Sequence, residues 1–273
     1  MRMKALCLVI LLSSIHGVRS QDSIRLILEF KMVHVVDITQ PTNTRISPCM
    51  LLVGTKRSVF DDYYRSLRYL GYRGIATDRI YDDPNDIQDA VSGVTSDQIY
   101  TDFDKQTLIT GSYFWNTLYT KSEPLPSIDW TIQSQKKKIL DQECQMATAT
   151  FKGRHYTAWF APSIPVNAGP WKLNGLPGII LAANDDKNEI SFTCTKLTMP
   201  EKNAPRIVFA KNATLISAEK FEITRKAFIQ DPKAGMALAN PAGTLMAVTV
   251  SPGAAASQTK NKRRSLNNPI EKE

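Results

Sequence analysis

The chain has 273 residues, 42% of them hydrophobic, and a formal net charge of +8. Part of the positive charge lies at its two ends, in Arg2, Lys4 and Arg19 and in the basic run at 260–264, so the central part is close to neutral. Because proteins that bind nucleic acid gather Lys and Arg on a folded face, this distribution argues against a nucleic acid as partner.

Residues 1–20 have the pattern of a signal peptide. Arg2 and Lys4 precede an apolar run at 5–12, and Ser20 stands before the expected cleavage site. The apolar run is shorter than the roughly 20 residues that a membrane-spanning helix needs. We therefore expect cleavage before Gln21 and a mature protein without a transmembrane segment, which is periplasmic, associated with the outer membrane or secreted.

Residues 21–250 are expected to form one β-rich domain, of a size that is ordinary for an all-β protein. Short runs rich in β-branched and aromatic residues follow one another and are separated by turn-forming residues, as at Lys152–Arg154 and Asn184–Asn188. This pattern is typical of antiparallel strands that are neighbours in sequence. In chain order, the predicted strands are 24–38, 50–53, 98–103, 107–120, 129–132, 144–151, 155–160, 179–183, 189–197 and 206–210.

Two helices are predicted beside the strands. The first covers 58–70, where apolar and aromatic residues recur near helical spacing and Asp61 and Asp62 favour a first turn. The second follows Ser217, a candidate N-cap, and ends before Pro232. The fold class is therefore mainly β, a curved antiparallel sheet or half-open barrel with one or two peripheral helices.

Two segments are expected to lie outside the regular elements. Residues 71–95 are polar and broken by Gly and Pro, so they are predicted to form a surface connection. From Ser251 the chain is small, polar and basic with few large apolar residues, and such a segment cannot offset its ordering entropy. Residues 251–273 are therefore predicted to form a disordered basic tail.

Cleavage of the signal peptide would leave Cys49, Cys144 and Cys194. Strand alternation puts Cys194 on the same face as Ile190 and Phe192, which favours its burial. A disulfide between Cys144 and Cys194 requires their strands to be neighbours or to face each other closely. The alternative is that all three are buried free thiols. Their spacing contains no CxxC pair, so no metal site is predicted.

The most distinctive part of the chain is a series of short motifs. They are Asp129-Trp130, Gly153-Arg154-His155-Tyr156-Thr157-Ala158-Trp159-Phe160, Ile164-Pro165, Gly169-Pro170 and Gly175-Leu176-Pro177-Gly178-Ile179-Ile180. With these motifs and the ending Asn267-Asn268-Pro269-Ile270-Glu271, the chain resembles the GLPGLI family, exported proteins found in Bacteroidetes-type bacteria. Ile179 stands where the family name has Leu, a minor change in apolar volume.

The resemblance implies that the protein acts in the cell envelope, and it implies no reaction, substrate or cofactor. Members of the family are similar to the N-terminal accessory domain of some secreted peptide N-glycanases. Their genes are often associated with outer-membrane transport proteins. The resemblance therefore implies an envelope or outer-membrane protein as partner.

Four residues in the motif region are candidates for ligand contact: Arg154, Tyr156, Trp159 and Trp171. Aromatic faces stack on sugars and apolar groups, and an arginine in a turn can hold an anionic group. Each of the four also has a structural interpretation, since strand aromatics more often lie in the core and turn arginines are usually solvated or bonded to a backbone carbonyl. Alternation places Tyr156 and Trp159 on opposite faces of their strand.

The loop from Pro162 to Gly178 is rich in Pro and Gly, which preorganise its backbone. It could be a rigid surface loop that a partner recognises. It could instead be a plug that closes the end of a curved sheet, with Trp171, Leu173 and Leu176 turned inward. The plug is favoured, because these three apolar residues would otherwise be exposed.

Function is the least determined property. The mature chain keeps His34 and His155, and adjacent carboxylates such as Asp61-Asp62 fit capping or solvation better than acid/base chemistry. We therefore expect a non-enzymatic envelope binding or accessory protein without a cofactor. The alternative is a carrier of an apolar ligand in a half-open β-barrel. A concave sheet face of mostly large aliphatic residues would favour the carrier, and a concave face mixed with Tyr, Trp and polar groups would favour the accessory protein.

Overall fold

The computed structural model describes residues 22–42, 44–71, 97–114, 117–200, 205–209, 213–230 and 268–272. Its strands are β1 (Leu26–Val35), β2 (Thr44–Val53), β3 (Arg57–Asp62), β4 (Asp97–Asp102), β5 (Thr107–Phe114), β6 (Thr117–Pro124), β7 (Thr131–Ile139), β8 (Gln142–Phe151), β9 (Arg154–Ala161), β10 (Ile179–Asp185), β11 (Ile190–Thr198) and β12 (Thr214–Leu215). The helices are α1 (Tyr63–Tyr69) and α3 (Ala218–Gln230).

All of these strands belong to one 12-stranded sheet with the order β12-β6-β5-β4-β3-β2-β1-β11-β10-β9-β8-β7. Neighbouring strands pair antiparallel, except that β12 runs parallel to β6. Among the described residues the end strands β12 and β7 do not pair with each other, so the sheet is open. The predicted fold class is confirmed, including the two peripheral helices.

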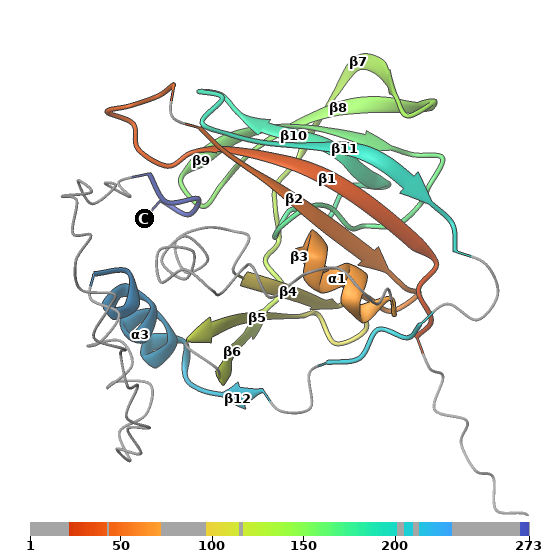
Figure 1. Cartoon of the computed structure of the whole chain (residues 1–273). Helices are drawn as coiled ribbons and strands as arrows, with labels where there is room; N and C mark the ends of the chain where they lie inside the picture. The colour runs from red at the N-terminus through yellow and green to blue at the C-terminus, as the bar shows by residue number, and fades with distance from the viewer. Residues whose placement is uncertain are drawn as a thin grey trace, which may run out of the picture.

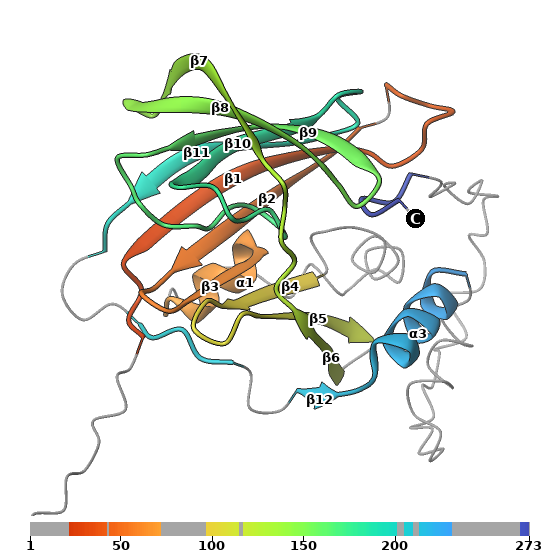
Figure 2. The same ribbon diagram turned by 180° about the vertical axis from the view of Figure 1, so that it is seen from behind.

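The sheet curves so that the half from β7 to β1 lies over the half from β3 to β6 (Figures 1 and 2). Three buried phenylalanines join the two halves. The ring of Phe60 on β3 meets Phe30 on β1 and Phe192 on β11 edge to face, with centroid distances of 6.3 and 6.1 Å. Because these pairs bury large rings and also gain from their edge-to-face geometry, they help to hold the curve closed.

The loop 162–178 fills the inside of the curve. Trp171 packs against the rings of Phe151 and Tyr156, with centroids 5.8 and 6.4 Å away. Gly178 permits the close return of the loop, because an added Cβ would lie against the carbonyl group of Ala161. The predicted plug is therefore present, and the concave face is packed rather than open. The loop residues buried in the main core are Ile164, Ala168, Trp171, Leu173 and Leu176.

The two helices cover other parts of the sheet. In α1, Leu67 packs with Met50 and Val59, which lie on the sheet face opposite the main core. The described part of α3 contributes Phe221 and Phe228 to a separate aromatic cluster with β5 and β6. Ser217 caps α3 as predicted, accepting a hydrogen bond from the amide of Lys220 at 3.2 Å. Neither described helix is long and apolar enough to span a membrane.

The predicted helix at 58–70 is only half helical, because its first part is β3. Val59 packs toward α1 whereas Phe60 enters the main core. This change of face between successive residues is the alternation of a strand. The aromatic spacing that suggested one long helix therefore comes from two elements joined end to end.

Four strand predictions also need correction. The strand predicted at 50–53 is the last part of β2, which begins at Thr44. The run 107–120 is two strands, β5 and β6, which pair as a hairpin with Phe114 opposite Thr117. The short strand predicted at 129–132 is instead β7, which extends through three exposed lysines to Ile139, because charged side chains are tolerated on an edge strand. The strand predicted at 206–210 is reduced, within its described residues, to one bridge between Ser23 and Arg206.

The cysteines Cys49, Cys144 and Cys194 are buried and free. The bridge between Cys144 and Cys194 is not formed, because β9 and β10 separate their strands in the sheet. Burial raises the pKa of the Cys194 thiol to about 12, so this side chain behaves as a small apolar group. No set of His, Cys, Asp and Glu side chains in the described ranges is placed to hold a metal ion.

The predicted signal peptide, the connection at 72–95 and most of the tail lie outside the described residues. The last five described residues, 268–272, differ from the predicted disorder. Ile270 is buried in the main core and Asn268 is 2% exposed. One apolar side chain and one buried amide therefore anchor a segment whose composition predicts no order.

Candidate functional site

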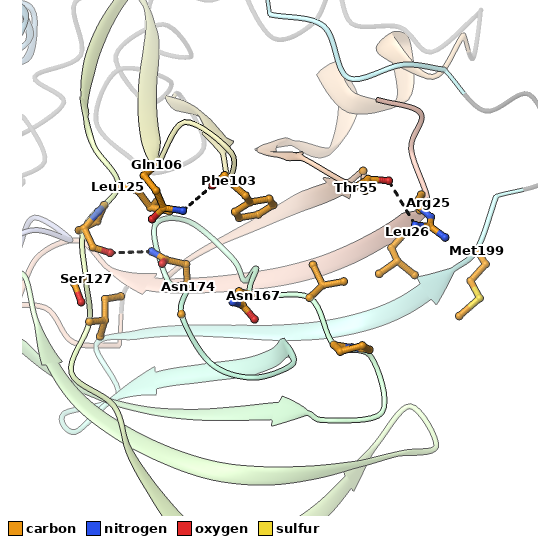
Figure 3. A pocket seen from close by; sticks show the side chains of 16 residues that line it. Arg25, Leu26, Thr55, Phe103, Gln106, Leu125, Ser127, Asn167, Asn174 and Met199 are labelled. Atoms are coloured by element: carbon orange, nitrogen blue, oxygen red, sulfur yellow. Dashed lines mark hydrogen bonds between the residues drawn. The ribbon is translucent and has the colours of Figure 1, made fainter. Parts of the chain in front are cut away.

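A cleft of about 860 Å³ lies at the end of the sheet where β1 begins (Figure 3). Small-molecule sites in proteins have volumes of about 300–1,000 Å³, so this cleft is large enough to hold a ligand. Its walls are the residues at the start of β1, the β2–β3 turn, the β4–β5 turn, the connection 125–128, parts of the loop 165–175 and Met199 after β11.

The first wall is fixed by Asp22. Its carboxylate accepts hydrogen bonds from the backbone amides of Thr55, at 2.6 Å, and Lys56, at 3.0 Å. Gly54 makes room for this contact, since a Cβ at that position would lie 2.5 Å from a carboxylate oxygen of Asp22. The β2–β3 turn is thereby held in one conformation beside Arg25, whose guanidinium reaches the Thr55 hydroxyl at 3.5 Å.

Backbone hydrogen bonds connect the next walls to one another. The amide of Phe103 donates to the carbonyl of Lys56 at 2.8 Å, and the amide of Leu125 donates to the carbonyl of Gln106 at 2.8 Å. The side chain of Gln106 closes its own turn with a 2.6 Å bond to the Phe103 carbonyl. Because these turns are tied together before any ligand arrives, little ordering entropy remains to be lost on binding.

The last wall contains the beginning of the Gly175–Ile180 motif. The side-chain amide of Asn174 donates to the carbonyls of Lys172 at 3.0 Å and Pro126 at 3.5 Å. The backbone carbonyl of Asn174 accepts a hydrogen bond of 2.8 Å from the indole N–H of Trp130. Gly175 has φ +90°, a conformation that glycine adopts without strain. The motif therefore has two roles, because Ile179 and Ile180 continue into β10 and the main core.

The lining of the cleft combines apolar surface with uncharged hydrogen-bonding groups. Phe103, Val166 and Met199 provide apolar contacts, while Thr55 and Asn167 provide hydroxyl and amide groups. Among the described lining residues, Arg25 is the one charged side chain. Such a surface suits a ligand with both apolar and uncharged polar groups.

The structure places the four predicted contact residues elsewhere. Tyr156 and Trp171 are buried in the core, where burial raises the pKa of Tyr156 and its hydroxyl has no hydrogen-bond partner among the described residues. Trp159 is half-buried on the opposite face of β9, with the ammonium of Lys137 4.1 Å from its ring centroid. Tyr156 and Trp171 therefore belong to the plug and its packing, and Trp159 is covered by a lysine.

Arg154 is buried and paired with two carboxylates. Its Nη1 donates to Asp185 and, at 2.8 Å, to Glu189. Although partial burial opposes ionisation, hydrogen bonds from Arg154 and Lys272 lower the pKa of Glu189 to about 2. Arg154 is thus part of an internal charge network and does not present its guanidinium to an external anion.

His34 lies at the C-terminal end of β1 beside this network. Burial and the nearby Arg154 and Arg45 lower its pKa to about 4, although its hydrogen bond to the carbonyl of Asn268 opposes the shift. That 2.8 Å bond requires the proton on Nε2 and leaves Nδ1 buried with no hydrogen-bond partner in the described residues. The folded protein therefore favours the neutral ring.

Stability is expected to fall as the pH is lowered from 6.5 toward 4. The unfolded chain binds a proton to His34 below about pH 6.5, whereas the folded chain does so only near pH 4. The stability that neutral His34 contributes is therefore complete above pH 6.5 and lost below pH 4. The expected loss in the free energy of unfolding from His34 is about 3 kcal/mol. Urea unfolding across this range would measure it. The loss of stability should be smaller by about this amount in His34→Gln than in the wild type, and unchanged in the control His155→Gln, which alters an exposed histidine.

Comparison with known proteins gives a partial family match and a fold match. Residues 150–182 match the family described as Protein of unknown function (Porph_ging). No curated protein matches the chain. Two crystal structures of PNGF-II, in space groups C2 and P21, are similar at 12% identity, with TM-scores of 0.52 and 0.53 and 77% of this chain covered.

The chain spans about a third of the length of PNGF-II, 33% and 34% in the two structures. The match at residues 150–182 covers β9, the loop 162–178 and the first strand residues of β10. The chain is therefore similar, over its central motif, to a family of unknown function and, in fold, to one part of PNGF-II.

Proposed function

We propose that this protein is an exported binding module of the cell envelope that holds a ligand in the cleft and acts beside another envelope protein. The observation that carries the proposal is the preformed cleft, whose walls are tied together by the hydrogen bonds of Asp22, Phe103, Leu125 and Asn174. A cleft that is ordered without its ligand is the usual form of a small-molecule site.

The accessory role is supported by two further observations. The fold corresponds to about a third of a longer chain, PNGF-II, so a domain of this kind can be one part of a larger protein. The motifs around Gly175–Ile180 resemble the GLPGLI family, whose associations point to secreted peptide N-glycanases and outer-membrane transport proteins. Export rests on the signal-peptide pattern of residues 1–20.

The carrier of an apolar ligand is the weaker candidate. Such a carrier needs an open apolar interior, but the concave face of the sheet is occupied by Trp171, Leu173 and Leu176 of the chain itself. The cleft mixes Phe103 and Val166 with amide and hydroxyl groups. A mixed lining favours the binding module over the carrier.

Native mass spectrometry of the protein purified from its own envelope tests the proposal. Met199 lines the cleft and is 67% exposed, so Met199→Trp should block the cleft without disturbing the core. Ile132→Trp on β7, at a position that is 47% exposed, is the matched control. We expect a non-covalent adduct on the wild type and the control, reduced at least tenfold on Met199→Trp.

Either of two outcomes would count against the proposal. An adduct that survives Met199→Trp unchanged would place the ligand outside the cleft. A lipid as the sole retained molecule would instead favour the carrier, and extraction followed by fragmentation of the adduct distinguishes a lipid from a polar ligand.

A further inference from the structure

The C-terminal segment Asn268–Lys272 is held in a groove at the far end of β1 from the cleft. The groups that contact the segment come from the end of β1, the β8–β9 turn and the residue before β11, and this contact surface is called the groove below. The segment itself is part of no strand of the described sheet (Figure 1).

The start and the end of β1 are roughly 30 Å apart, since the strand is 10 residues long. The two sites approach each other more closely through the loop 162–178, because Lys172, which pairs with Glu271, is two residues from Asn174 in the cleft wall. The residues that bond to the segment are nevertheless not among those that line the cleft, so the groove is a second site.

Arg154 lies at the bottom of this groove and donates hydrogen bonds to the segment. Its Nε donates to the carbonyl of Ile270 at 2.9 Å, and its Nη2 donates to Asn268 Oδ1 at 2.6 Å and to the carbonyl of Pro269 at 2.7 Å. With the two bonds of Nη1 to Asp185 and Glu189, all five guanidinium donors are used. Three of the five acceptors belong to the segment.

The side chain, the backbone amide and the backbone carbonyl of Asn268 all make hydrogen bonds. Its side-chain amide donates to the carbonyl of Val35 at 2.6 Å, and its backbone amide donates to the carbonyl of Val36 at 3.2 Å. Its own carbonyl is the acceptor of the bond from His34. An alanine at this position would lose both side-chain bonds and leave a buried donor of Arg154 without its acceptor.

The side chains after Asn268 differ in burial and in the groups that they contact. Pro269 is exposed, Ile270 enters the main core, and Glu271 pairs with the buried ammonium of Lys172 at 2.6 Å. The amide of Lys272 donates to the carbonyl of Lys152 at 2.9 Å. The backbone of Lys272 passes so close to Gly153 that an added Cβ there would lie 2.7 Å from its carbonyl oxygen.

We propose that this groove is a peptide-recognition site, which takes an extended segment of the form Asn, any residue, aliphatic, acidic, and which the chain's own residues 268–272 occupy reversibly. Selectivity comes from the side-chain bonds to Asn268, the core contact of Ile270 and the ion pair of Glu271. The groove walls belong to strands whose pairing is complete without the segment. The occupant can therefore leave without dismantling the sheet.

The segment and the groove belong to the same chain, and this sets a scale for the affinity. Binding within one chain has effective concentrations on the order of 1 mM. Because the groove is occupied, a free peptide of the same sequence should bind an empty groove with a Kd below about 1 mM.

The test uses the full chain carrying Asn268→Ala and Ile270→Ala, which weakens the tethered occupant. A fluorescent peptide with the sequence of residues 266–273 should bind this variant saturably and bind the wild type at least tenfold more weakly, since the native segment competes. A control peptide with alanine for Asn268 should also bind at least tenfold more weakly. A folded variant that binds no peptide at about 1 mM would overturn the proposal.

If the variant does not fold, hydrogen exchange on the wild type tests whether the segment leaves the groove reversibly. The amides of Asn268 and Lys272 are bonded to Val36 and Lys152, so reversible release predicts that they exchange at least tenfold faster than the amides of β1. Exchange of these two amides at the same rate as β1 would show that the segment leaves only on global unfolding. That result would overturn the proposal.

Discussion

Replacing Arg154 with alanine is expected to lower the free energy of unfolding by about 3–5 kcal/mol. The side chains of Arg154 and Asp185 are each 1% exposed, and removal of the guanidinium leaves the carboxylate of Asp185 without its cation. It also removes the donors of three bonds to the C-terminal segment. Urea unfolding followed by circular dichroism at neutral pH measures the change.

Arg25→Ala is the matched control, because Arg25 is exposed and makes one long hydrogen bond of 3.5 Å to Thr55. Surface substitutions of this kind usually change stability by no more than about 0.5 kcal/mol. A loss at Arg154 as small as that at Arg25 would mean that the buried charge network contributes little to the fold.

Trp171→Ala is expected to destabilise the protein by about 3–5 kcal/mol, because it removes the largest side chain of the plug and leaves a cavity. The ring is 4% exposed and packs on Phe151 and Tyr156. Thermal and urea unfolding both report the change, and loss of near-ultraviolet circular dichroism would show that the aromatic packing is altered.

Trp159→Ala serves as the matched control, since its ring is half-buried and faces Lys137 rather than the plug. We expect it to cost about 1 kcal/mol, chiefly through the loss of the cation–π contact and partial burial. Trp159 packs against the main core only in part. Equal losses in the two variants would therefore contradict the conclusion that Trp171 contributes more than Trp159 to the packed interior.

The sheet could be predicted from the sequence because its signals are local. Alternation along β9 placed Tyr156 and Trp159 on opposite faces of the strand, and in the structure Tyr156 is buried in the core while Trp159 is half-buried on the other face. The helix predicted at 58–70 failed because the change from strand to helix at Tyr63 carries no Gly, Pro or other local break. The length of β7 was underestimated because its three successive lysines break the apolar–polar alternation of a strand. Such a charged run is tolerated in a strand at the edge of a sheet.

The cleft could not be predicted, because it is assembled from turns that are far apart in the chain. Thr55, Phe103, Asn167 and Met199 come together only through the curvature of the sheet. Candidate residues chosen by chemical type, such as Arg154 and Trp171, instead proved to be buried where their partners come from other strands. The one local signal of the cleft was Gly175, whose motif begins in its wall.

The C-terminal segment shows the limit of composition as a guide. Residues 251–267 lie outside the described part of the chain, and the same polar composition continues to the end. Within it, the side-chain amide of Asn268 is hydrogen-bonded to Val35 and Ile270 is buried in the main core, at sites made by residues far away in the sequence. An aliphatic residue directly after Asn-Pro, in a tail whose other large apolar residue is Leu266, was the available signal.

A crystal structure of the protein purified from its own cell envelope, in a sample whose mass shows a bound ligand, tests the central claim most directly. The account predicts ligand density in the cleft, in contact with Phe103 on one side and with the wall around Asn167 and Gly175 on the other. Ligand density on another face, for example over Trp159, with the cleft holding only water, would contradict it.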